Sequence, residues 1–98
     1  MKPIIIFATF KTKPESADFV ATELNKLAAA CRNEEGCLRY QPHRDIKQPD
    51  TFYLHESLAD KELLGRHGAA EPLRLFRAAV ADHIVATEVK YARELNAD

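Results

Sequence analysis

The spacing of hydrophobic residues near the start of the chain predicts a β-strand over residues 3–11. Both sets of alternating positions are apolar, with Ile4 and Ile6 on one face and Ile5 and Phe7 on the other. A strand in an antiparallel sheet with one solvated face usually alternates apolar and polar residues instead. The pattern therefore predicts a strand that is covered on both faces.

The hydrophobic period then changes to that of an amphipathic helix over about residues 16–34. One stripe of this helix is formed by Val20, Leu24, Leu27, Ala28 and Cys31. Pro14 and Ser16 are typical of a helix start, and Gly36 suits the left-handed conformation in which many helices end. These signals predict a single helix between the first two strands.

Two strands follow the helix, one beginning at Cys37 and one over residues 51–58, with a turn at residues 47–50 between them. Pro42 lies within the earlier strand. Because proline cannot donate a hydrogen bond to a neighbouring strand, this strand is predicted to lie at a sheet edge. The later strand is then expected to be central.

The last third of the chain predicts a short helix capped by Asp60, an amphipathic helix after Pro72, and a strand over about residues 85–95. The resulting order is βαββαβ, with the second helical part in two pieces. This order is that of the ferredoxin-like α+β fold, a four-stranded antiparallel sheet with helices on one face. We expect residues 1–98 to form one such domain.

The predicted fold leaves one face of the sheet without helices, although the first strand is apolar on both faces. A second copy of the chain could supply the missing cover, since identical subunits commonly associate through one self-complementary patch. The pattern therefore predicts a homodimer in which the open sheet faces pack together.

Composition and charge argue against a nucleic-acid-binding protein and against a membrane protein. The chain is 46% hydrophobic and 30% charged, with a formal net charge of −1 and acids and bases mixed along its length. No basic stripe suited to nucleic acid is present, and no apolar run reaches the length of a membrane span. Two cysteines and the absence of a secretion signal predict a cytoplasmic protein. Cys31 and Cys37 are interpreted as structural, because their spacing fits neither a zinc site nor a redox motif.

Histidines and one glutamate are the candidates for chemistry. We expect His43 to be solvated and His83 to lie in the last turn of a helix, where the helix dipole favours a cation. His55 and Glu56 alternate on the strand over residues 51–58, so one should face the helices and the other the dimer partner. His67 shares the inward side of its short helix with apolar residues. No metal-ligand spacing is present, and no metal site is expected.

Glu56 stands out because it shares a strand face with Phe52, Leu54 and Leu58. A carboxylate in apolar company requires a partner or a raised pKa, and such residues cluster at functional sites. A structural or interface role for Glu56 is an equally good interpretation at this point. The residues alone thus predict a small dimeric α+β domain with one or two polar side chains directed at an apolar interior.

The segments "EEGCLRYQPHRD", "TFYLHESLADKELLGRH" and "LRLF", in this order and spacing, resemble the antibiotic biosynthesis monooxygenase family, including its small quinol monooxygenases. The resemblance implies a dimeric α/β barrel. It also implies oxidation of a small quinol or phenolic aromatic by molecular oxygen without metal, flavin or haem. His67 and Glu56 match recurrent residues of the family and are the implied catalytic residues. The implied substrate-binding residues are Thr9, Tyr40, Leu64 and Phe76.

The family is functionally mixed, so other activities stay open. Its haem-degrading branch is disfavoured, because the chain has no tryptophan and carries Thr9 near the place of that branch's asparagine. An isomerase of a small phosphorylated dicarbonyl compound would need a cationic pocket, for which the candidate residues are Arg39, Arg66, Arg74 and Arg77. A non-catalytic dimer that binds a hydrophobic ligand is the third alternative.

Overall fold

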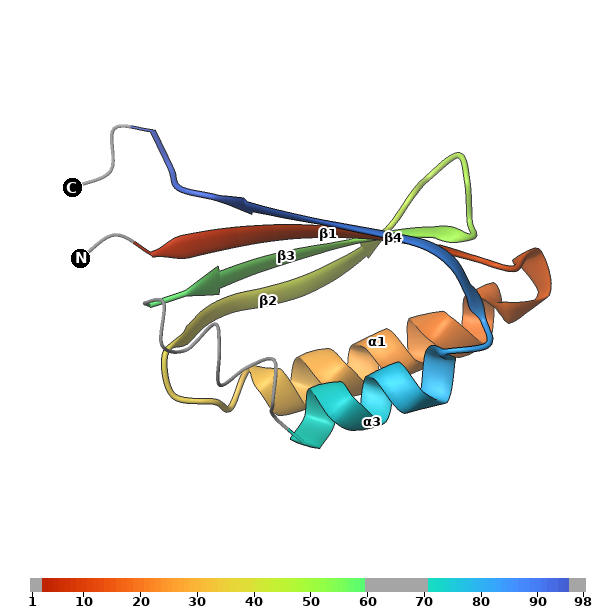
Figure 1. The fold of residues 1–98 in the computed structure, drawn as a ribbon, viewed down its shortest axis with the longest axis horizontal. Helices are drawn as coiled ribbons and strands as arrows, with labels where there is room; N and C mark the ends of the chain where they lie inside the picture. Colours follow the sequence, from red (N-terminus) through yellow and green to blue (C-terminus); the bar gives the residue numbers. More distant parts are fainter. Residues whose placement is uncertain (1–2, 60–70, 96–98) are drawn as a thin grey trace.

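The structure, a computed structural model, describes residues 3–59 and 71–95. Its elements follow the order β1 (Ile4–Thr12), the short 3-10 helix η1 (Pro14–Ser16), α1 (Ala17–Cys31), β2 (Cys37–Arg44), β3 (Thr51–Leu58), α3 (Glu71–Val80) and β4 (Ile84–Ala92). The strands form one antiparallel sheet in the order β2-β3-β1-β4, and both helices lie against the same face (Figure 1). The predicted ferredoxin-like α+β fold is confirmed. The short helix expected from Asp60 lies outside the described residues.

The core forms between the helices and the face of the sheet that carries Ile6, Ala8, Leu54 and Phe52. Val20 of α1 is fully buried there, and the predicted helix stripe lies against the sheet. Burying this set of large apolar side chains, at about 1.5–3 kcal/mol each, is the main force that holds α1 on the sheet.

The open face of the sheet is the second surface of the molecule. Here the side chains of β1 are Ile5, Phe7 and Thr9, and Phe7 is 49% exposed. Leu38 and Tyr53 on the neighbouring strands are also exposed. On this face Ile5 is buried but Phe7 is exposed, so a single chain covers the open face of β1 only in part.

The ends of the helices differ from the sequence expectation. Helix α1 ends at Cys31 rather than near residue 34, because Asn33 and Glu34 make tighter bonds, each to the carbonyl three residues earlier. Gly36 has a φ of 82° and turns the chain into β2, which only glycine does without strain. Pro42 lies on the edge strand β2, and β3 is central, as predicted.

His83 does not lie in a helix. Helix α3 ends at Val80, and His83 belongs to the turn that precedes β4. Its Nδ1 is 2.8 Å from the buried Ser16 hydroxyl oxygen, and its ring centroid is 4.8 Å from that of Phe19. The backbone carbonyl of His83 also accepts a bond from the Lys13 N–H (3.0 Å). His83 thus connects the start of α1 to the start of β4, and the expected dipole role was wrong.

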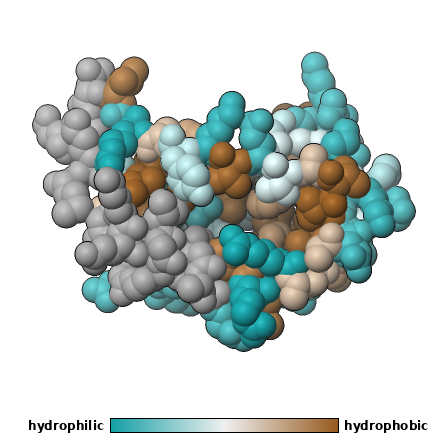
Figure 2. All heavy atoms as spheres, viewed as in Figure 1, coloured by the Kyte–Doolittle hydropathy of each residue, from teal (hydrophilic) through white to brown (hydrophobic). Residues whose placement is uncertain are grey.

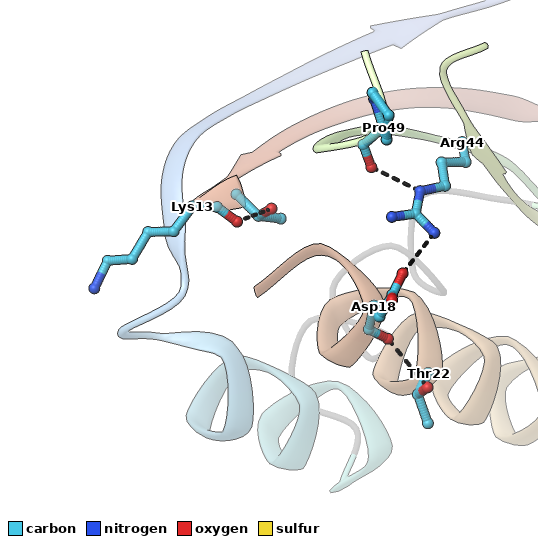
Figure 3. A network of polar contacts seen from close by, with 6 residues as sticks. Lys13, Asp18, Thr22, Arg44 and Pro49 are labelled. Carbon is cyan, nitrogen blue, oxygen red and sulfur yellow. Dashed lines mark hydrogen bonds and ion pairs between the residues drawn. The ribbon is translucent and has the colours of Figure 1, made fainter. Parts of the chain in front are cut away.

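Arg44 connects the β2–β3 turn to the first turn of α1 (Figure 3). Its Nε donates to the Pro49 carbonyl oxygen at 2.6 Å, and its guanidinium lies 3.1 Å from the Asp18 carboxylate. The Thr22 hydroxyl donates to the backbone carbonyl of Asp18 (3.1 Å). Surface ion pairs of this kind contribute little by themselves, so the network orients the turn more than it stabilises the fold.

Candidate functional site

A cavity of about 250 Å³ lies between the helices and the helix-covered face of the sheet. Its apolar lining consists of Ile6, Ala8, Phe10, Leu27, Leu54, Leu73, Phe76 and Val89. Figure 2 shows apolar side chains gathered in the hollow between the sheet and the helices, with hydrophilic side chains around it. Among the described residues, the polar side chains that line the cavity are Tyr40, Glu56, Arg77, Thr87 and Tyr91.

Glu56 lies at the buried end of this cavity. It is 5% exposed and is held on central strand β3 between its register partners Ile6 of β1 and Tyr40 of β2. Its Oε1 atom is inaccessible to solvent. His55, the next residue back along β3, faces the opposite side, where its ring stacks on Phe7 at 5.1 Å. The register therefore places Glu56, and not His55, in the cavity.

Tyr40 stands beside Glu56 and is only 2% exposed. Directly opposed residues on neighbouring antiparallel strands hold their Cβ atoms roughly 5 Å apart, so the two side chains enter the cavity together. Burial first, and then the negative charge of Glu56, raises the pKa of the Tyr40 phenol far above its ordinary value of 10.0. Tyr40 is therefore a protonated hydrogen-bond donor at neutral pH.

The two cysteines are unsuited to nucleophilic chemistry. Burial, followed by a hydrogen bond and the charge of Glu34, raises the pKa of the Cys31 thiol from 9.0 to about 12. Burial and then the Glu34 charge also raise the pKa of Cys37. Both thiols are free. Since the thiolate is the reactive form, the structure supports the interpretation of these residues as scaffold.

Phe76 forms the wall contributed by α3. It is buried, and its ring meets that of Phe10 edge to face with centroids 6.0 Å apart. Together with Leu73 of the same helix, it presents an apolar surface suited to the flat ring of an aromatic compound. The predicted residues Glu56, Tyr40 and Phe76 thus line one cavity.

Thr9 does not line this cavity. It lies on the open face of the sheet, paired across the strands with Tyr53 and Glu88. The expectation that it contacts the same substrate as Glu56 is corrected, because odd-numbered residues of β1 point away from the helices. His67 and Leu64 lie outside the described residues, and their places in the site stay predictions.

The arginines considered for a phosphate pocket do not converge within the described part of the chain. Arg39 donates from Nε to His55 Nδ1 on the open face (3.2 Å), and Arg74 pairs with Glu71 on the exposed side of α3. Arg77 alone of the three lines the cavity. Arg66 lies outside the described residues. The isomerase alternative therefore gains no support from the charges that the structure describes.

Sequence reasoning missed the wall that β4 contributes. Thr87, Val89 and Tyr91 line the cavity because they pair with Phe10, Ala8 and Ile6 of β1. Their alternation is visible in the sequence, but it does not reveal which face of the sheet they share. Tyr91 is 62% exposed, so this wall reaches the solvent and forms part of the cavity rim.

Two negative findings apply to residues 3–59 and 71–95. Within them, no group of three His, Cys, Asp or Glu side chains is placed to hold a metal ion. None of the helices in these ranges has the length and apolar character needed to cross a bilayer.

The fold is that of a ferredoxin-like α+β domain with a mostly apolar cavity between sheet and helices. The sequence matches the antibiotic biosynthesis monooxygenase family over residues 3–81, and the chain belongs to this family. The resemblance seen in the sequence motifs is thereby confirmed. No functionally curated protein matches the chain at a significant level.

Solved structures agree with this assignment. Protein PA3566 from Pseudomonas aeruginosa is 28% identical, with a TM-score of 0.93 over 97% of this chain and 96% of its own. A structure described as an antibiotic biosynthesis monooxygenase is 26% identical, with a TM-score of 0.89 over 94% of this chain and 98% of its own. A conserved protein from Methanosarcina mazei is 21% identical and shares the fold, with a TM-score of 0.88 over 96% of this chain and 94% of its own.

Proposed function

We propose that the protein is a cofactor-independent monooxygenase that oxidises a small quinol or phenolic aromatic with molecular oxygen. Its family and the similar structure described as a monooxygenase support this assignment. The observation that carries it is the pair Glu56 and Tyr40, a buried carboxylate and a buried phenol in an otherwise largely apolar cavity. This pairing suits a ligand that is a flat apolar ring with a hydroxyl group.

The size of the cavity limits the substrate to about one or two rings. An apolar cavity of about 150 Å³ already binds benzene. The cavity beside Glu56 measures about 250 Å³, which leaves room for a second ring or for substituents. Large polycyclic substrates are therefore excluded unless the cavity widens on binding.

The chemistry begins with removal of the phenolic proton. A carboxylate in hydrogen-bond reach of the substrate hydroxyl can accept that proton or orient the hydroxyl toward another base. We assign this role to Glu56, with His67 as the second candidate base on the strength of the family motif. The Tyr40 phenol, which is hydrogen-bonded to the Cys31 side chain in the structure, would turn its O–H to the oxygen anion that forms.

The substrate itself supplies the electrons. The electron-rich phenolate passes one electron to molecular oxygen, and the two radicals combine at a ring carbon. One oxygen atom stays on the ring, and the other leaves as water as the ring reaches the quinone level. The apolar walls, including Phe76, exclude water that would otherwise divert these intermediates.

The active form is proposed to be a homodimer that buries the open sheet face, including the exposed Phe7 ring. Molecular oxygen and a small aromatic compound are the remaining partners. Its location in the cytoplasm stays a prediction, which the two free cysteines support.

Oxygen consumption by metal-stripped protein with a panel of quinols and polyphenols tests the proposal. Wild type is compared with Glu56→Gln, Tyr40→Phe and His67→Ala, and with Glu15→Gln as an exposed control. We expect Glu56→Gln to lower kcat about 100-fold or more, in line with the loss of a positioned acid–base group, and the control to match wild type.

The competing ligand-binding function has a distinct outcome. If quinols bind at micromolar concentration but oxygen uptake stays at the rate without enzyme, the protein is a ligand-binding dimer and not an oxygenase. Folding of every variant is checked by circular dichroism, so that loss of activity is not confused with loss of structure.

A further inference from the structure

The register of the sheet shows which side chains surround Ala8 on the floor of the cavity. Ala8 lies on the inner strand β1 and pairs with Leu54 of β3 on one side and with Val89 of β4 on the other. Ile6 and Phe10 lie before and after it on the same face of β1, because side chains alternate along a strand. Ala8 therefore has four neighbours on this face, and all four line the cavity together with Ala8 itself.

Ala8 is smaller than each of these four neighbours. Its side chain is a single methyl group, and the residue is 4% exposed. On the side of the helices, the same cavity is lined by Leu27 of α1 and by Leu73 and Phe76 of α3. Ala8 thus lies at the centre of the floor, where a larger side chain would occupy space that now belongs to the cavity.

Glu56 lies close to Ala8 on the same face of the sheet. Glu56 pairs with Ile6, and Leu54, two residues before Glu56 on β3, pairs with Ala8. Ala8 and Glu56 are therefore diagonal neighbours, whose Cβ atoms lie roughly 7 Å apart. A ring that rests on the Ala8 methyl group can direct a hydroxyl group at the carboxylate within this distance, since an O–H···O hydrogen bond takes up about 2.7 Å of it.

We propose that Ala8 is a specificity-determining residue: the ring of the substrate lies against its methyl group, and its small size admits a second fused ring. One small side chain among four larger apolar ones fits the flat face of an aromatic ring, which then contacts all of them at once. This inference rests on the proposed function and adds the residue that decides which ring systems enter the cavity.

The first test compares ligands of two sizes in the absence of oxygen, so that binding is separated from turnover. Phenol and 2-naphthol are titrated by calorimetry into wild type, Ala8→Val and the control Ala86→Val. Ala86 receives the same substitution at an exposed position of β4, where it pairs with Lys11 and does not line the cavity. Thermal melting verifies that each variant is folded.

We expect Ala8→Val to weaken the binding of 2-naphthol about tenfold or more and that of phenol less than about threefold. The two added methyl groups take up space that the second ring requires, and a misfit of this size in an apolar pocket costs tenfold or more in binding. Ala86→Val should bind both ligands as wild type does.

The second test uses wild type alone and does not depend on the stability of a variant. Alanine methyl groups are labelled with carbon-13, and NMR follows them during titration with 2-naphthol without oxygen. The face of an aromatic ring shields protons that lie against it, so the Ala8 methyl resonance should move upfield. The Ala86 methyl resonance should not move.

The inference would be overturned if Ala8→Val weakened the binding of both ligands equally or left that of 2-naphthol unchanged. It would also be overturned if wild type bound neither ligand, or if 2-naphthol did not shift the Ala8 methyl resonance. Should Ala8→Val fail to fold, the methyl shift in wild type decides.

Failure of this inference is distinguishable from failure of the proposed function. Oxygen uptake with quinols, combined with no effect of Ala8 on ligand binding, removes the inference alone. Contact between the ligand ring and Ala8, combined with oxygen uptake at the rate without enzyme, removes the oxygenase and keeps the role of Ala8 in binding.

Discussion

The thiol of Cys31 shows how the surroundings of one residue decide its chemistry. Its pKa rises from 9.0 to about 12, mainly through burial. The thiolate fraction at pH 8 is therefore far smaller than that of an ordinary cysteine. A side chain that is reactive in the unfolded chain becomes an inert part of the core.

This predicts that Cys31 resists alkylation in the folded protein. Treatment with iodoacetamide at pH 8, followed by peptide mass spectrometry, should modify Cys31 at least 100-fold more slowly than in urea-unfolded protein. Cys37, which is half-buried, should react at an intermediate rate. Labelling of Cys31 at the unfolded rate would contradict its placement in the core.

The sequence predicted which residues are candidates for the site, but not which of them lie on the face of the sheet that the helices cover. The alternation of His55 and Glu56 shows that they point to opposite sides, but a shift of one residue in register exchanges them. In the structure Glu56 pairs with Ile6, whose side chain lies under the helices, so Glu56 and not His55 faces the helices. Thr9 was named on the family resemblance, whereas its alternation with Ala8 along β1 puts it on the open face.

At the scale of elements, the β2–β3 hairpin depends on one carboxylate. Asp45 Oδ1 accepts bonds from the backbone N–H groups of Lys47 and Gln48, each at 2.8 Å. Its Oδ2 accepts the Tyr53 hydroxyl at 2.6 Å. The Tyr53 hydroxyl first, and then the two N–H groups, lower the pKa of Asp45 below its ordinary value of 3.8.

The hairpin should therefore lose stability in acid. Because the pKa of Asp45 is lower in the folded state, its contribution is fully present above pH 3.8 and is lost as the pH falls through the folded pKa. Asp45→Asn keeps an acceptor for the turn but removes the charge. Urea unfolding from pH 2.5 to 6 should show a smaller change of stability with pH in Asp45→Asn than in wild type.

Asp82→Asn, at an exposed position in the turn after α3, serves as the control. It should keep the pH dependence of wild type. Equal pH dependence in Asp45→Asn and wild type would show that the Asp45 carboxylate is not held in the folded hairpin.

Element types followed from periodicity, whereas the end of α3 depended on tertiary contacts. The stripe from Val20 to Cys31 predicts the buried side of α1 correctly. The end of α3 at Val80 could not be predicted from the sequence. His83 is held in the following turn by the Ser16 hydroxyl and by the Lys13 N–H, and both residues are far away in the sequence. The β4 wall of the cavity was missed for a related reason, since it requires the register of β4 on β1.

For the molecule as a whole, the open face of the sheet is the surface on which exposed apolar side chains lie next to one another. Phe7 is half exposed at its centre, with Leu38 and Tyr53 exposed on the flanking strands. Contiguous exposed apolar side chains of this kind mark interaction surfaces. The βαββαβ order made this face predictable from the sequence, because the helices can cover only one side of the sheet.

We predict that wild type sediments as a dimer at micromolar concentration and that Phe7→Glu shifts it to a monomer. A charge at the centre of an apolar interface must be desolvated without a partner, so the dimer dissociation constant should rise about 100-fold or more. Leu75→Glu, on the exposed surface of α3, is the matched control and should remain dimeric. A monomeric wild type would remove the proposed dimer.

Pro42 of β2 affects how readily the protein aggregates through the edges of its sheet. Exposed sheet edges recruit strands from neighbouring molecules and so begin fibrils. Pro42 removes one donor from the β2 edge, and the β4 edge carries the Glu88–Lys90 ion pair at 3.5 Å. Neither edge offers an uninterrupted template. Concentrated solutions of the folded protein should therefore resist edge-to-edge addition of strands.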